Sequence, residues 1–278
     1  MILVVGHKGM LGQDVMGLLG ERGRGVDLPE IDITDLLSVQ QVLTALKPAV
    51  VVNCAAYTDV DGCESNSGTA MQVNGEGVAF LALITREIGA KLVQISTDYV
   101  FDGSKGSPYR EDDLPRPLNV YGESKLAGEL NLDVNPDNLL IRTQWLYGLH
   151  GKNFVETMLR LGQEKEQLGV VDDQIGAPTW TVDLARGIIA LIDAGCRGTY
   201  HVANSGITSW NGFARAIFEE AGMAVQVDPM TTEQLNRPAR RPLYSTLDCS
   251  KLVADSGFTP QPWRDALHQY VLLRNKEQ

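Results

Sequence analysis

The sequence predicts an α/β protein, with a doubly wound, Rossmann-like parallel sheet and a smaller α+β lobe. Short runs of β-branched residues alternate with longer helical segments, as in βαβ units whose parallel sheet is covered on both faces. A glycine-rich turn also follows the first apolar run and opens a helix. The length of 278 residues favours one large unit or two closely joined lobes.

The first half of the chain should supply most of the sheet. Pro48 and Gly89 each end a helix, because proline lacks a backbone N–H and glycine readily adopts the turn after a helix. In chain order we expect a strand at 2–5, a helix at 10–19, a weaker strand ending at Asp27, a helix at 35–46, a strand at 50–53, a helix at 69–88, and strands at 92–95 and 139–142.

The pattern is looser beyond His150. We expect a helix at 154–161, a strand at 168–171, a helix at 183–192, a strand at 199–202, and helices at 210–220, 250–255 and 263–273. The sheet domain then comprises residues 1–150 and 172–203, and the smaller lobe comprises residues 151–171 and 204–278. Because no flexible linker separates them, the lobes should pack around a cleft.

The composition excludes several classes of protein. A net charge of −11 repels phosphate backbones, so no nucleic-acid partner is expected. Apolar stretches fall short of the roughly 18–20 residues of a membrane span, and the first residues lack the segments of a secretory signal. The four cysteines show neither close pairing nor metal-type spacing, which indicates a reduced, cytoplasmic protein.

The glycine turn is the first candidate binding site. Gly6, Gly9 and Gly12 follow the first strand and open the helix that begins with Met10 and Leu11. One glycine permits the tight turn, another lets backbone approach a pyrophosphate, and the third allows close packing of helix on strand. Their spacing is that of short-chain dehydrogenases, so the turn predicts a nicotinamide dinucleotide.

Charged residues near the second strand bear on the cofactor. Asp27 would accept from ribose hydroxyls and disfavour a 2′-phosphate, whereas Lys8 and Arg24 argue the other way, so NADH and NADPH both stay open. A carboxylate and an apolar side chain at Asp32 and Ile33 could meet the adenine. The alternative is that an aspartate here caps the next helix.

Mostly small side chains follow the third strand. Asn53, Ala55, Ala56 and Tyr57 stand at its carboxyl end, where open α/β sheets bind ligands. The small residues there let a cofactor lie against the backbone. The acidic loop that follows lacks the remaining ligands of a calcium site, so we assign no metal.

The candidate reacting groups come from two segments. Tyr121 and Lys125 are four apart on an expected helix capped by Asn119, so they can share a pocket in which an ammonium lowers the pKa of a phenol. Ser96 and Thr97 end the fourth strand, and the Thr97 hydroxyl can donate to a carbonyl oxygen that gains negative charge. The alternatives are that Tyr121 and Lys125 form a solvated surface pair and that Thr97 caps a loop.

Two glycines of the same helix need a reason. Gly122 and Gly128 each weaken a helix by about 1 kcal/mol relative to alanine. We therefore predict that each allows a close approach of neighbouring backbone.

Several further stretches match one known pattern. They are residues 53–64, 73–74, 96–103, 121–125, 142–145, 173–179 and 241–242. Together with the glycine turn they span nearly the whole chain, which resembles the dTDP-4-dehydrorhamnose reductase family of extended short-chain dehydrogenases.

The resemblance implies an NADPH- or NADH-dependent oxidoreductase of dTDP-rhamnose biosynthesis, which reduces the C4 keto group of dTDP-4-dehydro-L-rhamnose to dTDP-L-rhamnose. Tyr121 would donate the proton, Lys125 would bind the ribose and lower the tyrosine pKa, and Thr97 would polarise the carbonyl. The implied substrate residues are Thr97, Asp98, Tyr99, Trp145 and Arg241. The expected cofactor residues are Gly6, Gly9, Met10, Leu11, Gly12, Asp27, Asp32, Ile33, Asn53, Ala55, Ala56, Tyr57, Ser96, Tyr121 and Lys125.

Two of the substrate residues have alternative roles. Trp145, a wall against the sugar by resemblance, could instead pack in the core. Arg241 stands in a basic stretch with Arg237 and Arg240 that suits nucleotide phosphates, although such clusters are usually solvated.

Other functions remain as alternatives. Dehydratases of related fold carry Asp-Glu after the threonine, whereas Asp98 is followed here by Tyr99, which favours simple reduction. Another nucleotide-sugar 4-ketoreductase or an epimerase-reductase stays open. The scaffold also resembles the non-catalytic regulatory subunit of methionine adenosyltransferase, but the presence of Thr97, Tyr121 and Lys125 together favours catalysis.

Quaternary structure is left undecided. Some members of the family are associated with a carboxylate-bound metal at a dimer contact. Only Asp14 is a candidate ligand here, so we predict no metal and leave a homodimer open.

Overall fold

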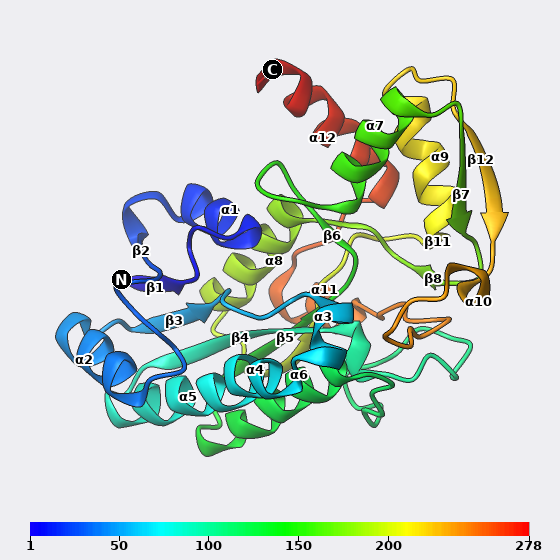
Figure 1. Cartoon of the computed structure of the whole chain (residues 1–278). Helices are drawn as coiled ribbons and strands as arrows, with labels where there is room; N and C mark the ends of the chain where they lie inside the picture. The colour runs from blue at the N-terminus through cyan, green and yellow to red at the C-terminus, as the bar shows by residue number, and fades with distance from the viewer. Residues whose placement is uncertain (278) are drawn as a thin grey trace.

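Six parallel strands form the central sheet of the computed structural model, which describes residues 1–277 (Figure 1). The strand order β10-β5-β4-β3-β1-β2 confirms the predicted doubly wound class. The strands are β1 (Ile2–Val5), β2 (Gly23–Val26), β3 (Val50–Asn53), β4 (Lys91–Thr97), β5 (Leu139–Thr143) and β10 (Gly198–His201). Because β1 lies between β2 and β3, the topological switch point falls between β1 and β3, where such sheets bind ligands.

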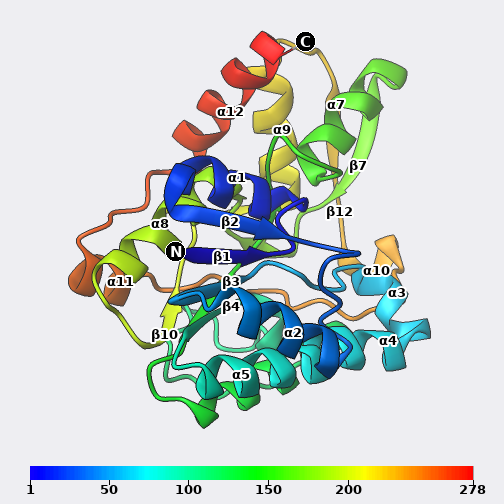
Figure 2. The same ribbon diagram turned by 90° about the vertical axis from the view of Figure 1, so that its left-hand side faces the viewer.

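Helices cover both faces of the sheet (Figures 1 and 2). The first face carries α1 (Met10–Leu19) and α8 (Thr181–Asp193). The second face carries α2 (Leu36–Leu46) and α5 (Gly77–Glu87), with α6 (Val120–Leu130) beside α5. Both faces are therefore buried, as the continuous apolar strands require.

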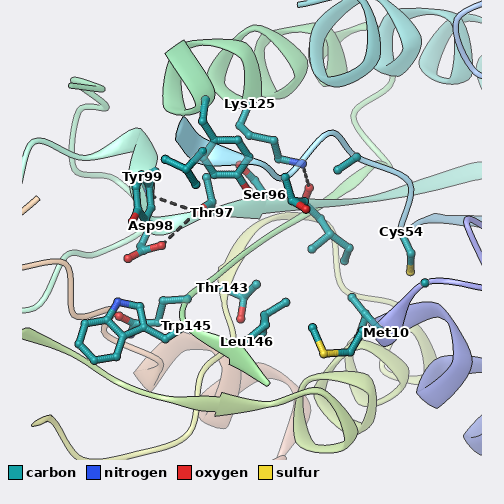
Figure 3. Close-up of a pocket in the computed structure, with 18 of the residues that line it drawn as sticks. Met10, Cys54, Ser96, Thr97, Asp98, Tyr99, Lys125, Thr143, Trp145 and Leu146 are labelled. Carbon is teal, nitrogen blue, oxygen red and sulfur yellow. Dashed lines mark hydrogen bonds between the residues drawn. The ribbon is translucent and has the colours of Figure 1, made fainter. Parts of the chain in front are cut away.

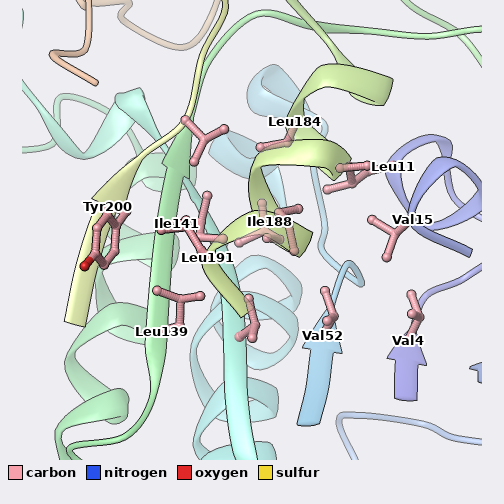
Figure 4. Close-up of a cluster of buried hydrophobic side chains, with 14 of the residues drawn as sticks. Val4, Leu11, Val15, Val52, Leu139, Ile141, Leu184, Ile188, Leu191 and Tyr200 are labelled. Atoms are coloured by element: carbon pink, nitrogen blue, oxygen red, sulfur yellow. The ribbon is translucent and has the colours of Figure 1, made fainter. Parts of the chain in front are cut away.

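Branched side chains fill the space between the sheet and its helices. Figure 4 shows Val15 of α1 and Ile188 of α8 with Val4, Val52 and Ile141 from the strands below them. All five are fully or almost fully buried. This packing holds the first turn of α1 close to the carboxyl end of β1.

The predicted helix at 69–88 is present but not uniform. It consists of α4 (Ser67–Met71), a π-helical turn (Gln72–Glu76) and α5. The turn contains Asn74, whose amide group accepts from the backbone N–H of Tyr57 and donates to its carbonyl, both at 2.9 Å. The irregular turn thus ties the helix to the loop that follows β3.

A second cluster of buried side chains lies beside the sheet. It is built by α7 (Phe154–Glu164), β7 (Gln167–Val171), α9 (Trp210–Glu220), β12 (Gln226–Met230) and α12 (Trp263–Glu277). The predicted helices and the strand of this region are present, with β12 paired in parallel to β7. Leu252, which the predicted boundaries assign to the smaller lobe, packs in the buried cluster that joins the sheet to α1 and α8. The domain boundaries therefore stay a proposal.

Besides β12, several elements of two to six residues were not predicted, because so few residues carry too little periodicity. They comprise β6 (Leu146–Tyr147), β8 (Ile175–Gly176), β9 (Thr179–Trp180), β11 (Thr208–Ser209), α3 (Val60–Ser65), α10 (Thr232–Leu235) and the 3₁₀ turns Gly20–Arg22, Asp98–Val100 and Asn131–Val134. By contrast, α11 (Ser250–Ser256) was expected. Among the described residues, no helix has the length and apolarity to cross a bilayer.

Candidate active site

Two adjoining cavities open at the carboxyl ends of the central strands. The main cavity, of about 490 Å³, lies among β4, α6 and the segment after β5, and the side cavity, of about 450 Å³, lies beside the second strand. Gly9, Cys54, Ala55 and Ala56 line both cavities. They therefore form one elongated site at the topological switch point.

The glycine turn is shaped by close backbone packing. Gly6 has φ +77°, and a Cβ there would lie 2.6 Å from the backbone nitrogen of Ala55. A Cβ on Gly12 would lie 2.3 Å from the carbonyl oxygen of Gly6. The close contacts of Gly6 and Gly12 therefore keep the turn tight. Gly9, between them, lines both cavities.

Most of the predicted cofactor residues meet at these cavities. Gly12 and Tyr57 line neither: Gly12 packs against the turn, and the backbone of Tyr57 is bound by Asn74. The main cavity is lined by Gly9, Met10, Leu11, Asn53, Ala55, Ala56, Ser96, Tyr121 and Lys125, and the side cavity by Gly6, Gly9, Asp27, Asp32, Ile33, Ala55 and Ala56.

Asp32 and Asp35 have different roles near the side cavity. Asp35 caps α2 by accepting from the backbone N–H of Leu37, so Asp32 is not the capping residue and lines the cavity instead. Asp27 accepts from the backbone N–H of Lys8 at 3.0 Å, which fixes its carboxylate beside the glycine turn.

Thr97, Tyr121 and Lys125 line the same main cavity, and Figure 3 labels Thr97 and Lys125. Thr97 ends β4, whereas the other two belong to the first turns of α6. As predicted, Asn119 caps this helix, accepting from the backbone N–H of Gly122 at 2.7 Å. The cap fixes where α6 begins and therefore where Tyr121 enters the cavity.

The phenol of Tyr121 is held in its protonated form. Burial raises its pKa, while a hydrogen bond with Thr97 acts in the opposite direction. Tyr99 packs edge-on against its ring, with the ring centroids 5.6 Å apart. The prediction that Lys125 lowers this pKa is therefore wrong in direction, because desolvation of the phenol outweighs every favourable contact.

Lys125 is a buried cation with one direct acceptor among the described residues. Its Nζ donates to the carbonyl oxygen of Ile95 at 2.7 Å, and only 5% of the residue is exposed. Burial lowers its pKa to about 8, and the nearby charge of Glu129 opposes that shift. The hydroxyl of Ser96 donates to the same Glu129 carboxylate, so this predicted cofactor residue also supports the lysine's surroundings.

Both glycines of α6 allow the close approach that was predicted. A Cβ at Gly122 would lie 2.2 Å from the carbonyl oxygen of Tyr99. A Cβ at Gly128 would lie 2.3 Å from the carbonyl oxygen of Asn74. The helix is therefore pressed against two backbone segments, and this contact sets the distance of Tyr121 and Lys125 from β4.

Three predicted substrate residues beyond Thr97 also line the main cavity: Asp98, Tyr99 and Trp145. Burial raises the pKa of Asp98 to about 7, although the hydroxyls of Ser245 and Thr97 act against it. Trp145 adopts φ +48°, a left-handed conformation that is costly for a bulky residue. Its indole faces the cavity, so the alternative prediction that Trp145 packs in the core is wrong.

Arg241 lies outside the lining of both cavities. Its guanidinium pairs with Asp61 at 3.1 Å and donates to the carbonyl of Ala239 at 2.8 Å. It also forms a hydrogen bond with Tyr99, which does line the main cavity. Arg237 pairs with the same Asp61 from a more exposed position. The contact of Arg241 with a substrate therefore stays a prediction.

Part of the wall that closes the main cavity was not predicted from the sequence. Trp145 and Trp210 stack with their ring centroids 3.7 Å apart, although they are far apart in the sequence. A Cβ on Gly176 would lie 2.5 Å from the Trp145 indole, so glycine is needed there. The missed lining residues are Cys54, Thr58, Val60, Ile95, Thr143, Gln144, Leu146, Lys152, Phe154 and Trp210.

Comparison with known proteins identifies the family. A family model described as the RmlD substrate binding domain matches residues 1–274. The dTDP-4-dehydrorhamnose reductase of Streptomyces griseus is 48% identical over 95% of this chain and 91% of that protein. This chain belongs to the RmlD family. Within that family, the dTDP-4-keto-6-deoxy-D-glucose reductase of Streptomyces niveus is 41% identical over 99% of this chain and 98% of that protein.

A solved structure of an RmlD relative supports both fold and cofactor class. The crystal structure of dTDP-4-dehydrorhamnose reductase from Bacillus anthracis str. Ames, in complex with NADP, matches with a TM-score of 0.94. The two chains are 40% identical, and the match covers 98% of each. The predicted RmlD-like fold is confirmed, and the nicotinamide prediction agrees with the ligand of that relative.

The residues of this chain fit a nicotinamide dinucleotide. A substituent on Gly6 would collide with the neighbouring backbone, so the turn stays narrow, while Ala55 and Ala56 leave room along both cavities. Asp27 stands beside the turn and lines the side cavity, whereas Lys125 lines the main cavity. Within residues 1–277, no group of three or more His, Cys, Asp and Glu side chains is placed to hold a metal ion.

Proposed function

We propose that this protein reduces the C4 keto group of dTDP-4-dehydro-L-rhamnose to give dTDP-L-rhamnose, with NADPH or NADH as cofactor. One observation carries the proposal: Thr97, Tyr121 and Lys125 line one cavity that continues to the glycine turn. The similarity to the dTDP-4-dehydrorhamnose reductase of S. griseus supports the choice of sugar substrate, and the NADP complex of the B. anthracis relative supports a nicotinamide cofactor.

The cofactor residues have separate tasks. When bound, the reduced nicotinamide supplies the hydride. Gly9 and the first turn of α1 would hold the pyrophosphate, because free N–H groups at a helix start attract phosphate oxygens. Asp27 would accept from the adenosine ribose, and Lys125 would donate to the ribose at the nicotinamide end.

Tyr121 is the proton donor in this proposal. Its raised pKa keeps the phenol protonated at neutral pH until negative charge develops on the substrate oxygen. Thr97, at the end of β4, donates a hydrogen bond to the same oxygen. The positive charge of Lys125 stabilises the phenolate that remains, and this charge is retained below a pH of about 8.

A second candidate is reduction of a different dTDP-linked 4-keto sugar. The S. niveus relative is a dTDP-4-keto-6-deoxy-D-glucose reductase of nearly the same length, so the family fold accepts more than one sugar. An epimerase-reductase activity is the variant of this candidate in which the configuration of a ring carbon is inverted before the keto group is reduced.

The test is to follow the absorbance band of reduced nicotinamide while purified protein is incubated with one sugar at a time. The panel contains dTDP-4-dehydro-L-rhamnose, dTDP-4-keto-6-deoxy-D-glucose and their uridine-linked counterparts. We expect the highest kcat/KM for dTDP-4-dehydro-L-rhamnose. A higher value for another sugar would select the second candidate, and no oxidation with any sugar would favour a non-catalytic binding subunit.

We also propose a cytoplasmic location and leave a homodimer as a hypothesis. All four cysteines are free thiols, as expected in a reducing compartment. Sedimentation equilibrium at several protein concentrations distinguishes monomer from dimer.

A further inference from the structure

Three buried polar atoms of the main cavity have no hydrogen-bond partner in the described part of the chain. They are Oδ2 of Asp98, Oγ1 of Thr143 and Nε2 of Gln144, and all three residues line the cavity. Their exposed fractions are only 1%, 3% and 2%. Buried polar groups are nearly always bonded, because an unpaired one costs about 1–3 kcal/mol, so three in one cavity wall indicate a ligand.

Thr143 stands beside the reacting centre. It is the last residue of β5 and the register partner of Thr97 on β4. Figure 3 shows it between Thr97 and Leu146, on the side of the cavity that faces Trp145. The two hydroxyl side chains therefore end neighbouring strands at the same edge of the sheet. In the described part of the chain the Thr143 hydroxyl has no partner, whereas the Thr97 hydroxyl donates to the carboxylate of Asp98 at 3.0 Å and accepts from the backbone N–H of Tyr99 at 3.2 Å.

Gln144 is oriented by its own backbone neighbour. Its Oε1 accepts from the backbone N–H of Ala177 at 3.2 Å. Because that N–H can only donate, the amide oxygen must face Ala177, and the unpaired Nε2 must be the donor. Asp98 is arranged in the complementary way when it is ionised, since its Oδ1 accepts from Thr97 and its Oδ2, which has no partner in the described part of the chain, can then accept a hydrogen bond.

We infer that Thr143 and Gln144, acting with Asp98, recognise hydroxyl groups on the hexose ring. This inference rests on the proposed function, because it assigns the residues that read the sugar in the same site. The set offers one acceptor, one donor and one hydroxyl that does both, which matches ring hydroxyls that donate and accept at once. The three atoms have almost no exposed surface, so sugar binding requires a small shift of the side chains that cover them.

The same set should make the site selective for hydroxylated sugars. A sugar that lacks a contacted hydroxyl leaves a buried polar group unpaired, and such sites reject the deoxy analogue strongly. The aromatic wall of Trp145 and Trp210 has no comparable requirement, because stacking depends on surface and not on a particular hydroxyl.

The experiment combines two variants with two modified substrates. Thr143→Val keeps the shape of the side chain and removes only the hydroxyl, and Gln144→Met removes the amide. The substrates are the nucleotide-linked keto sugar with the highest kcat/KM and its 2-deoxy and 3-deoxy counterparts. Thr246→Val is the matched control, since Thr246 carries another buried hydroxyl without a partner but lies outside the cavity lining.

We expect Thr143→Val and Gln144→Met each to lower kcat/KM for the parent sugar by about tenfold or more. For the analogue that lacks the contacted hydroxyl, the variant and the wild type should have equal kcat/KM. The KM for reduced cofactor should change less than about twofold. Thr143→Val and Thr246→Val should each keep or raise the melting temperature, because each removes an unpaired buried hydroxyl.

Equal losses on the parent and both deoxy sugars, or no loss on any, would overturn the inference. If the wild type reduces no nucleotide sugar, the proposed function fails, and the inference is then decided by calorimetric titration with a dTDP-linked 6-deoxyhexose and its deoxy counterparts. Weaker binding of only the parent sugar by Thr143→Val supports it. Identical binding by variant and wild type, or no binding by the wild type, refutes it.

Discussion

Arg142 and Glu129 form a buried, two-pronged ion pair on the inner side of α6. Nη2 of the arginine lies 2.7 Å from Oε2 of the glutamate, and Nε lies 3.0 Å from Oε1. Glu129 follows Lys125 by four residues, so both side chains lie on one face of the helix. The negative charge of Glu129 favours the charged form of Lys125, whose pKa burial lowers to about 8. The ion pair therefore contributes to the electrostatics around Lys125, which we propose as a catalytic residue.

Replacing Glu129 should move the alkaline limit of activity. With a pKa of about 8, Lys125 loses its charge as the pH rises, so turnover should fall above that pH. Glu129→Gln removes the charge that supports the ammonium and leaves Arg142 as an unpaired cation, so the pKa of Lys125 should drop further. We expect the alkaline midpoint of kcat to fall by about one pH unit.

The control for this change is Glu164→Gln, which removes the carboxylate of the exposed Arg160–Glu164 pair. Its pH profile should match that of the wild type. An unchanged alkaline midpoint in Glu129→Gln would show that the ion pair only stabilises the fold.

Removal of the Tyr121 hydroxyl tests the proton donor. Tyr121→Phe should lower turnover by roughly 10²–10⁴, the usual range for a lost general acid. The dissociation constant of the cofactor should change little, because the ring and its contact with Tyr99 stay. Tyr109→Phe, at a tyrosine that donates to Asp102 and does not line the main cavity, is the comparison. Turnover close to that of the wild type would exclude Tyr121 as the donor.

The sequence predicted most of what depends on local pattern. The glycine turn, the strands of the sheet and the cap at Asn119 were predictable because each depends on a few adjacent residues. Gly122 and Gly128 were also informative, because a glycine inside a helix is costly unless something must approach it.

The remaining features depend on contacts between distant segments. The stack of Trp145 on Trp210 and the ion pair of Arg241 with Asp61 join residues that no local spacing relates. The pKa of Tyr121 was predicted in the wrong direction because sequence shows a neighbouring lysine but not the depth at which a phenol is buried.

Gly122→Ala should destabilise the protein although alanine is the better helix former. The added methyl group would meet the carbonyl oxygen of Tyr99 at 2.2 Å, so α6 must move away from the 3₁₀ turn after β4. We expect a loss of about 1–3 kcal/mol in the free energy of unfolding, measured by urea denaturation, together with a lower kcat. Gly17→Ala in α1, where a Cβ meets no atom within 4 Å, should instead stabilise by up to about 1 kcal/mol. A stabilising Gly122→Ala would contradict the close approach.

Arg241→Ala tests whether this residue acts on the nucleotide sugar. The variant removes the contact with Tyr99 on the cavity wall and one of the two arginines that pair with Asp61, so the local positive charge that would attract a phosphate falls. We expect the KM for the sugar to rise more than the KM for the cofactor. Arg237→Ala removes the exposed partner of the same carboxylate, so its effect should be much smaller. Equal changes in both KM values would limit Arg241 to a structural role.

Asp98→Asn should stabilise the protein at neutral pH but not at acid pH. The pKa of Asp98 is raised from 3.8 to about 7, so between these values the folded protein keeps a proton that the unfolded chain releases. The free energy of unfolding therefore falls as the pH rises through this range, and asparagine escapes that fall while still accepting from Thr97. We expect the variant to gain roughly 2–4 kcal/mol at pH about 7.5 and almost nothing at pH about 4.

The matched control has the opposite sign. Hydrogen bonds from Ser250 lower the pKa of Asp248, so its carboxylate stabilises the fold above its ordinary pKa and loses that contribution as the pH falls. Asp248→Asn should therefore lose stability at neutral pH, with the difference from the wild type shrinking toward acid pH. Urea denaturation at both pH values measures both variants. A pH-independent effect of Asp98→Asn would mean that Asp98 is ionised in the folded protein and that its surroundings are better solvated than the burial of its side chain indicates.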